Sequence, residues 1–249
     1  MKVMKFGGTS VGKPQRMHEV AKLIARDEES KIVVLSALSG TTNALVQISE
    51  SLSRGDRAEA KQQIDSLHEH YQNFILELLK DTNTREKASA VLNEHFEFLT
   101  IILKISFSQA LNKDILAQGE LLSTKLFSIY LEEIKVNHVL LPALDFMTIA
   151  SYDAPRVGTI KVKLAPLLNK HKDTSVFITQ GYISRNAKGE VDNLKRGGSD
   201  YSASLIAAAI NASVCEIWTD IDGMHNNDPR VVEKTKAIES FKLAAKYGN

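Results

Sequence analysis

The chain has 249 residues, 43% of them hydrophobic, and its 31 Lys and Arg residues nearly balance 30 Asp and Glu residues, for a formal net charge of +1. Such a chain is long enough for one large α/β domain or two small ones, and it lacks the basic field that draws proteins to nucleic acid. It also lacks a secretory signal, a stretch apolar enough to span a membrane, and a second cysteine with which Cys215 could form a disulfide. We therefore expect a cytoplasmic protein with neither a nucleic-acid partner nor a membrane partner.

The first 36 residues predict a strand, a helix and a second strand. Residues 2–6 read as a strand, and Pro14 opens a helix with apolar residues at helical spacing. The run from Lys31 to Ser36 has a continuously apolar centre, which is typical of a strand buried on both faces of a parallel sheet. This order and spacing indicate a βαβ unit.

A glycine-rich turn, Gly7-Gly8-Thr9-Ser10, follows the first strand. Glycines let main-chain N–H groups close on an anion, the two hydroxyls add donors, and Lys5 adds a positive charge just before the turn. The turn is a candidate phosphate-binding site. An ordinary strand-to-helix turn accounts for the glycines equally well.

The same segment resembles a Walker A loop. Gly7 to Lys13 fits all but the last position of that pattern, where Pro14 stands in place of Ser or Thr. Proline has no hydroxyl for Mg²⁺ and no N–H to offer. A P-loop NTPase is therefore the weaker interpretation, and it leaves Lys5 unexplained.

The second strand leads into another loop of small and hydroxyl residues, from Ser36 to Asn43. Ligands bind at the carboxyl ends of strands in open α/β sheets, so this loop is a candidate binding loop; a simple helix N-cap is the alternative.

The middle of the chain predicts a helical insertion over about 56–135. It contains neither glycine nor proline between Gly55 and Gly119, and its apolar residues recur at helical spacing. The polar stretch 81–84 breaks it into arms, and a further helix covers about 113–135. The remaining predicted elements are a strand at 139–141, a helix near 159–169, a strand at 175–180, a hairpin turn at 186–189, a helix at 201–210 and a strand at 215–219. The seven scattered histidines suggest no zinc site.

A second candidate anchor, Arg196-Gly197-Gly198-Ser199-Asp200, precedes the helix at 201–210. Capping and the helix dipole account for Ser199 and Asp200. They do not account for Arg196.

Four motifs together resemble the aspartate kinases of the amino acid kinase family. They are Lys5 to Ser10, Gln118 to Ser123, Arg196 to Tyr201, and Trp218 to Gly223 with Asp228 to Arg230. The resemblance implies a three-layer αβα sandwich with a mainly parallel, about eight-stranded sheet, formed by one catalytic domain over 1–249. It implies transfer of the ATP γ-phosphoryl group to the side-chain carboxylate of L-aspartate, the first step of lysine, threonine and methionine biosynthesis, with Mg²⁺ and a homodimer.

The resemblance also assigns residues to roles. Lys5, with the amides of Gly7 and Gly8 and with Thr9, would hold the transferred phosphoryl group, and Asp200 would orient the lysine or the Mg²⁺ shell. Arg196 would bind the α-carboxylate of aspartate and Glu120 its ammonium group. The rest of the aspartate pocket would be Ser36, Thr42, Tyr182 and Ser199, and the nucleotide would contact Thr219, Asp220, His225 and Arg230. No protein ligand to a metal is assigned.

Two departures from the family pattern affect these expectations. His225 stands where the family usually has tyrosine, and the chain ends at Asn249, where family members continue into a Gly-Ala-Lys segment and two ACT domains. We therefore expect a catalytic-domain fragment without feedback control. The alternatives are a relative acting on acetylglutamate, glutamate or a nucleotide monophosphate, and a non-catalytic nucleotide-binding module.

Overall fold

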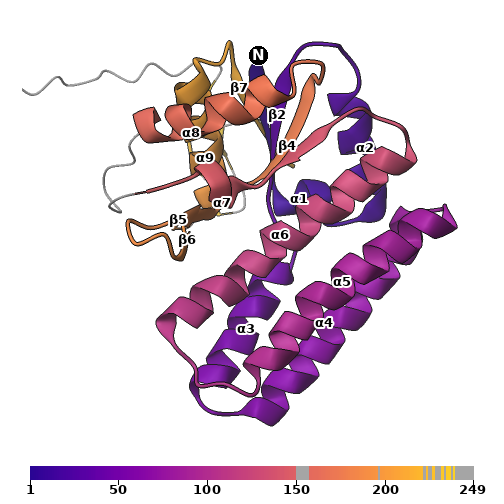
Figure 1. Cartoon of the computed structure of the whole chain (residues 1–249), viewed down its shortest axis with the longest axis vertical. Helices are drawn as coiled ribbons and strands as arrows, with labels where there is room; N and C mark the ends of the chain where they lie inside the picture. The colour runs from indigo at the N-terminus through magenta and orange to yellow at the C-terminus, as the bar shows by residue number, and fades with distance from the viewer. Residues whose placement is uncertain are drawn as a thin grey trace, which may run out of the picture. The chain divides into compact units, whose positions relative to one another are not determined.

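The computed structural model describes residues 1–149, 157–195, 197–220, 223, 226–227, 231–232, 234–236 and 238. The chain divides into two compact units, Met1–Trp218 and Thr219–Asn249. The helices and strands of the described residues all belong to the first unit (Figure 1). In this described part, no helix is both long enough and apolar enough to cross a membrane.

The centre of the first unit is a five-stranded parallel sheet with the strand order β3-β4-β2-β1-β7. Its strands are β1 (Lys2–Phe6), β2 (Lys31–Leu35), β3 (Val139–Leu141), β4 (Val176–Gln180) and β7 (Cys215–Trp218). The register pairs Phe6 with both Leu35 and Trp218, and Leu35 with Gln180. The carboxyl ends of four strands therefore meet at one edge of the sheet.

Helices cover both faces of this sheet, because alternate strand residues point in opposite directions. Met4 and Phe6 pack into one apolar core with the helices α2 (Pro14–Ile24), α3 (Thr41–Ser53), α4 (Arg57–Leu78), α5 (Thr82–Ile102) and α6 (Gln109–Glu133). Val3 packs into a second core with α7 (Ala143–Phe146), α8 (Val157–Lys170) and α9 (Gly198–Ile210). Figure 1 shows α8 and α9 on the side of the sheet opposite α2. The predicted mainly parallel αβα architecture is confirmed.

Three long helices occupy the range predicted for the helical insertion. The side chains of Asp56, Asp81 and Ser108 accept backbone N–H groups at the starts of α4, α5 and α6. Each cap satisfies a donor that the first helical turn leaves free. In Figure 1 α4 and α5 form an antiparallel pair that lies beside α3 and α6.

The remaining strands, β5 (Ile183–Arg185) and β6 (Val191–Asn193), form a separate antiparallel hairpin. The Asn186 side chain accepts the backbone N–H groups of Lys188 and Glu190, and Gly189 has a φ of +81°. The predicted turn at 186–189 is therefore confirmed, with glycine at the position that needs a positive φ.

Candidate active site

Many of the predicted site residues follow the carboxyl ends of neighbouring parallel strands. Lys5 lies in β1 and Gly7 directly after it, Ser36 follows β2, and Tyr182 follows β4. Loops at this edge of an open α/β sheet form its ligand-binding crevice.

The glycine turn after β1 contains a short helix that the sequence does not predict. Gly7 is extended, and Gly8–Val11 then form a short helix, α1, which the sequence analysis missed. A Cβ atom on Gly8 would lie 3.0 Å from the Ala37 carbonyl oxygen, and one on Gly12 would lie 2.5 Å from the Ser39 Cβ. These glycines therefore let the β1 turn and the loop after β2 lie against each other.

Lys5 forms an ion pair with Asp200. Its Nζ lies 2.6 Å from Oδ1 of Asp200, and the lysine side chain is only 11% exposed, whereas that of Asp200 is 51% exposed. A Cβ atom on Gly7 would lie 3.3 Å from the same Nζ, so the ammonium group lies beside the glycine turn. Asp200 sits in the first turn of α9, where a carboxylate also complements the helix dipole. The structure thus brings the predicted cation, the glycine turn and the predicted carboxylate together.

Glu120 is a buried carboxyl group at the same edge. It is 3% exposed; Oε1 accepts the Ala37 N–H at 3.3 Å, and no protein group within hydrogen-bonding range meets Oε2 in the described part of the chain. Burial raises the pKa of Glu120 to about 8. Gly119 permits this approach, because a Cβ atom there would lie 2.8 Å from the Ala37 Cβ. A buried carboxyl with one unpartnered oxygen can accept a hydrogen bond from a further group, and a cationic donor would favour its ionised form.

Two hydroxyl contacts fix α6 against the strand ends. The Ser123 hydroxyl donates to the Ser36 carbonyl at 2.9 Å, and Gln180 Nε2 donates to the Thr124 hydroxyl at 2.7 Å. The sequence analysis missed Thr124 and Gln180 as supporting residues. Ser123 ends the quoted Gln118 to Ser123 motif, which was the available signal.

Tyr182 and Ser199 both lie at the carboxyl end of β4. Tyr182 has a φ of +63°, and its N–H donates to the Ser202 hydroxyl at 3.0 Å. A Cβ atom on Gly181 would lie 2.6 Å from the Ser199 hydroxyl oxygen, so Ser199 is close to the end of β4. Tyr182 is half-buried and Ser199 buried.

Thr42 and Thr9 lie on the helices that follow the first two strands. Thr42 is half-buried in the first turn of α3, and Thr9 is exposed in α1. Lys13, which a P-loop interpretation needs at the phosphates, is exposed and lies beyond α1. Most of the glycine turn is therefore part of α1, and Lys13 lies after the end of that helix.

Thr219 and Asp220 are the described residues among the nucleotide contacts predicted from the end of the chain. Thr219 and Asp220 belong to the second unit, where the Thr219 hydroxyl donates to Oδ1 of Asp220 at 3.2 Å. Arg196, His225 and Arg230 lie outside the described residues. Within the described ranges, no three His, Cys, Asp or Glu side chains gather as a metal site would require.

The chain is similar in sequence to proteins named as aspartokinases. The chain is 36% identical over 249 residues to lysine-sensitive aspartokinase 3 of Escherichia coli, covering 97% of this chain and 54% of that protein. It is 32% identical to the bifunctional aspartokinase/homoserine dehydrogenase of Haemophilus influenzae, covering 97% of this chain and 31% of the relative. The chain thus spans about half the length of the first relative and about a third of the second.

Solved structures of aspartokinase III are similar to this chain as well. The crystal structure of E. coli aspartokinase III in complex with aspartate and ADP has a TM-score of 0.82 and 34% identity, covering 96% of this chain and 53% of that one. The complex of the same enzyme with lysine and aspartate has a TM-score of 0.79. The model of the amino acid kinase family matches residues 1–245, and the chain therefore belongs to the amino acid kinase family.

Proposed function

We propose that this chain is an aspartate kinase, which transfers the γ-phosphoryl group of ATP to the side-chain carboxylate of L-aspartate and forms 4-phospho-L-aspartate. The observation that carries the proposal is Glu120, buried at the carboxyl edge of the sheet with Oε2 unpartnered among the described residues. The chain's relatives named aspartokinase, and the solved complex of E. coli aspartokinase III with aspartate and ADP, support the same activity.

The substrate's two charged ends account for two of the assigned residues. The aspartate ammonium group would pair with Glu120, and that pairing would offset the cost of an ionised carboxylate in a buried position. Arg196 would bind the α-carboxylate through two parallel N–H···O bonds. Ser36, Thr42, Tyr182 and Ser199 complete the proposed pocket, so the side-chain carboxylate is left to face the nucleotide.

The transfer needs positioning and positive charge rather than a strong base. An oxygen of the aspartate side chain forms a bond to the γ-phosphorus, and the bond from that phosphorus to the β,γ-bridging oxygen breaks, so that ADP leaves with the electron pair. The attacking carboxylate is already ionised and gives up no proton. Lys5 would stabilise the charge on the moving phosphoryl oxygens together with the amides of Gly7 and Gly8, and Asp200 would hold the ammonium group in place.

The nucleotide and its metal complete the proposal. Thr9, Thr219, Asp220, His225 and Arg230 are the proposed ATP contacts. Mg²⁺ would neutralise charge on the nucleotide phosphates. The chain fits a Mg²⁺ ion held mainly by phosphates and water, because Asp200 offers one half-exposed carboxylate and no three acidic or histidine side chains gather in the described part of the protein.

We further propose that residues 1–249 act as one catalytic domain with the helical insertion at about 56–135, and that the protein is a homodimer in the cytoplasm, in lysine, threonine and methionine biosynthesis. Light scattering coupled to size-exclusion chromatography measures the oligomeric state directly. A monomer at micromolar concentration would contradict the dimer.

The activity is tested by ADP release in a coupled assay with aspartate, glutamate and acetylglutamate as separate acceptors. We expect turnover with aspartate alone. Glu120→Gln should raise the aspartate KM by about tenfold or more while Glu97→Gln, the same change on an exposed position of α5, should leave it unchanged. ATP binding without turnover would reject the proposed activity, and turnover with glutamate or acetylglutamate instead would reassign the acceptor.

A further inference from the structure

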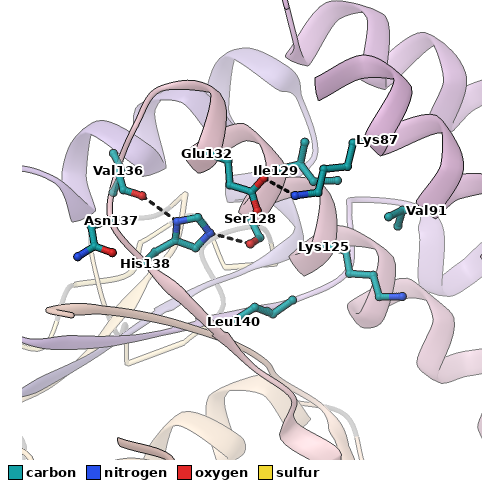
Figure 2. Close-up of a pocket in the computed structure, with 10 residues that line it drawn as sticks. All are labelled: Lys87, Val91, Lys125, Ser128, Ile129, Glu132, Val136, Asn137, His138 and Leu140. Carbon is teal, nitrogen blue, oxygen red and sulfur yellow. Dashed lines mark hydrogen bonds and ion pairs between the residues drawn. The ribbon is translucent and has the colours of Figure 1, made fainter. Parts of the chain in front are cut away.

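A pocket of about 590 Å³ lies between α5, α6 and β3, and no residue of the proposed active site lines it. Figure 2 shows the pocket with its lining residues: Lys87, Val91, Lys125, Ser128, Ile129, Glu132, Val136, Asn137, His138 and Leu140. Its volume lies in the range of small-molecule sites. We call it the α5/α6 pocket.

One face of α6 forms much of its wall. Lys125, Ser128, Ile129 and Glu132 recur at intervals of three and four residues, so their side chains share one side of the helix. The same helix carries Glu120, about one and a half to three and a half turns before them. A ligand in the α5/α6 pocket would therefore contact the helix that forms part of the proposed active site.

The polar part of the wall is a hydrogen-bonded chain with a fixed direction. Nδ1 of His138 lies 2.8 Å from the Val136 carbonyl oxygen, which can only accept, so Nδ1 carries a proton and donates. In the neutral ring Nε2 then accepts the Ser128 hydroxyl proton at 2.7 Å. Figure 2 shows both bonds. Ser128 and His138 are thus hydrogen-bonded to each other.

The charges leave one ammonium group available. Lys87 and Glu132 form an ion pair across the pocket rim and together are neutral. Nζ of Lys125 lies 3.6 Å from a carboxylate oxygen of Glu94, a long contact to a side chain that is 73% exposed. An ion pair that is exposed to water contributes little to stability. Lys125 can therefore leave Glu94 and pair with a bound anion instead.

The rest of the lining is aliphatic. Val91, Ile129, Val136 and Leu140 come from three segments of the chain, and Ile129 is almost fully buried. An aliphatic tail against these side chains would be removed from water, while its charged end stayed near the half-exposed Lys125.

We propose that the α5/α6 pocket binds a small carboxylate with a short aliphatic tail, whose carboxylate pairs with Lys125 and whose tail packs on Val91, Ile129 and Leu140. The proposal does not depend on the kinase activity, because the pocket and the proposed active site share no residue.

Isothermal titration of the full chain with hexanoate, 1-hexanol and hexylammonium tests it, because the three probes share one tail. We expect saturable hexanoate binding that is about tenfold or more tighter than that of either other probe. Lys125→Met keeps the apolar stem and removes the charge, so it should weaken hexanoate binding about tenfold or more. Lys104→Met makes the same change at an exposed lysine outside the pocket and should have no effect.

A second variant tests whether hexanoate binds in the α5/α6 pocket. Val91→Glu adds a carboxylate to the lining and should abolish hexanoate binding, with a circular dichroism spectrum like that of the unsubstituted protein. The proposal fails if hexanol binds as well as hexanoate, if Lys125→Met binds hexanoate unchanged, or if no hexanoate binding is detected up to about 10 mM.

Discussion

The hydroxyl group of Tyr71 lies 2.9 Å from the hydroxyl group of Thr41, and both residues are removed from solvent, with exposures of 0% and 2%. Tyr71 belongs to α4, whereas Thr41 begins α3 directly before the proposed aspartate ligand Thr42. Burial raises the pKa of Tyr71 far above its ordinary value, so its hydroxyl stays protonated. The helical insertion therefore holds the helix start at which the proposed substrate site begins.

Replacing Tyr71 with phenylalanine should affect stability and aspartate binding together. The Thr41 hydroxyl would lose its buried partner, so we expect a loss of about 1–3 kcal/mol in the free energy of unfolding. Because Thr42 follows directly, the aspartate KM should rise severalfold while the ATP KM stays unchanged. Urea denaturation and steady-state kinetics measure the two effects.

Thr41→Val and the double substitution Thr41→Val/Tyr71→Phe form the matched controls. If the hydroxyl pair is the cause, the aspartate KM of the double variant should equal that of either single variant. Independent effects would instead multiply the two fold increases in KM. An unchanged KM in all three would leave the pair with a purely structural role.

The buried carboxyl of Glu120 should make stability depend on pH. Its pKa in the folded protein is about 8 and its ordinary value is 4.5, so the folded state binds the proton more tightly than the unfolded state. The protonated group costs nothing below pH 4.5, and stability is lost as the pH rises from there through about 8. Glu120→Gln removes this cost, so the variant should gain on the unsubstituted protein across that window, by roughly 5 kcal/mol at pH 9.

Denaturation midpoints of both proteins at pH 5 and pH 9 measure that difference, and a difference independent of pH would contradict the assignment. Aspartate provides a second readout. Its ammonium group favours the ionised carboxylate, so binding at pH 7 should release a proton, which titration calorimetry in two buffers of different ionisation enthalpy detects.

The sequence predicted most of the fold because each main element has a local cause. The apolar run of β2 is buried along its whole length, and Asp56 and Asp81 cap the helices that follow them. The helix α1 could not be predicted in this way. Gly8 and Gly12 have low helix propensity, and this turn forms where the β1 segment packs against the loop after β2.

The site was predictable only through its motifs. Lys5 and Asp200 lie at opposite ends of the first unit's sequence, and no spacing rule joins them. In the sequence Glu120 looks like any solvated helix glutamate, because its burial and its hydrogen bond to Ala37 arise only when α6 packs in the folded protein. The partner there is the Ala37 backbone N–H, which leaves no trace in a side-chain pattern.

Gly12→Ala should separate the two loops at the glycine turn. The added Cβ would lie 2.5 Å from the Ser39 Cβ, 2.8 Å from the Gly8 carbonyl oxygen and 3.0 Å from the Ser39 nitrogen. We expect a loss of about 1–3 kcal/mol in stability and a raised ATP KM, because the β1 turn must shift. Gly158→Ala in α8 meets no atom within 4 Å beyond its chain neighbours and the adjacent backbone of its own helix, and it should keep or slightly raise stability. Equal melting temperatures for the two variants would contradict the close approach.

The ammonium group of Lys31 links the end of α2 to β2 and depends on Asp27. Lys31 is fully buried, and its Nζ donates to the Ile24 and Asp27 carbonyl oxygens at 2.8 Å each and to Oδ1 of Asp27 at 2.7 Å. The hydrogen bond from Lys31, with a second from Lys2, lowers the pKa of Asp27 from 3.8 to about 2. Neutralising this carboxylate would leave a buried ammonium group without its counter-charge.

Asp27→Asn should therefore destabilise the protein at neutral pH, and the difference should disappear in acid. Because the folded pKa lies below the unfolded one, the stabilisation is present above pH 3.8 and is lost as the pH falls through about 2. Denaturation of both proteins at pH 7 and pH 2 measures this, with Glu28→Gln, the neighbouring exposed acid, as the neutral control. A stability difference of the same size at both pH values would show that Asp27 acts through its shape rather than through its charge.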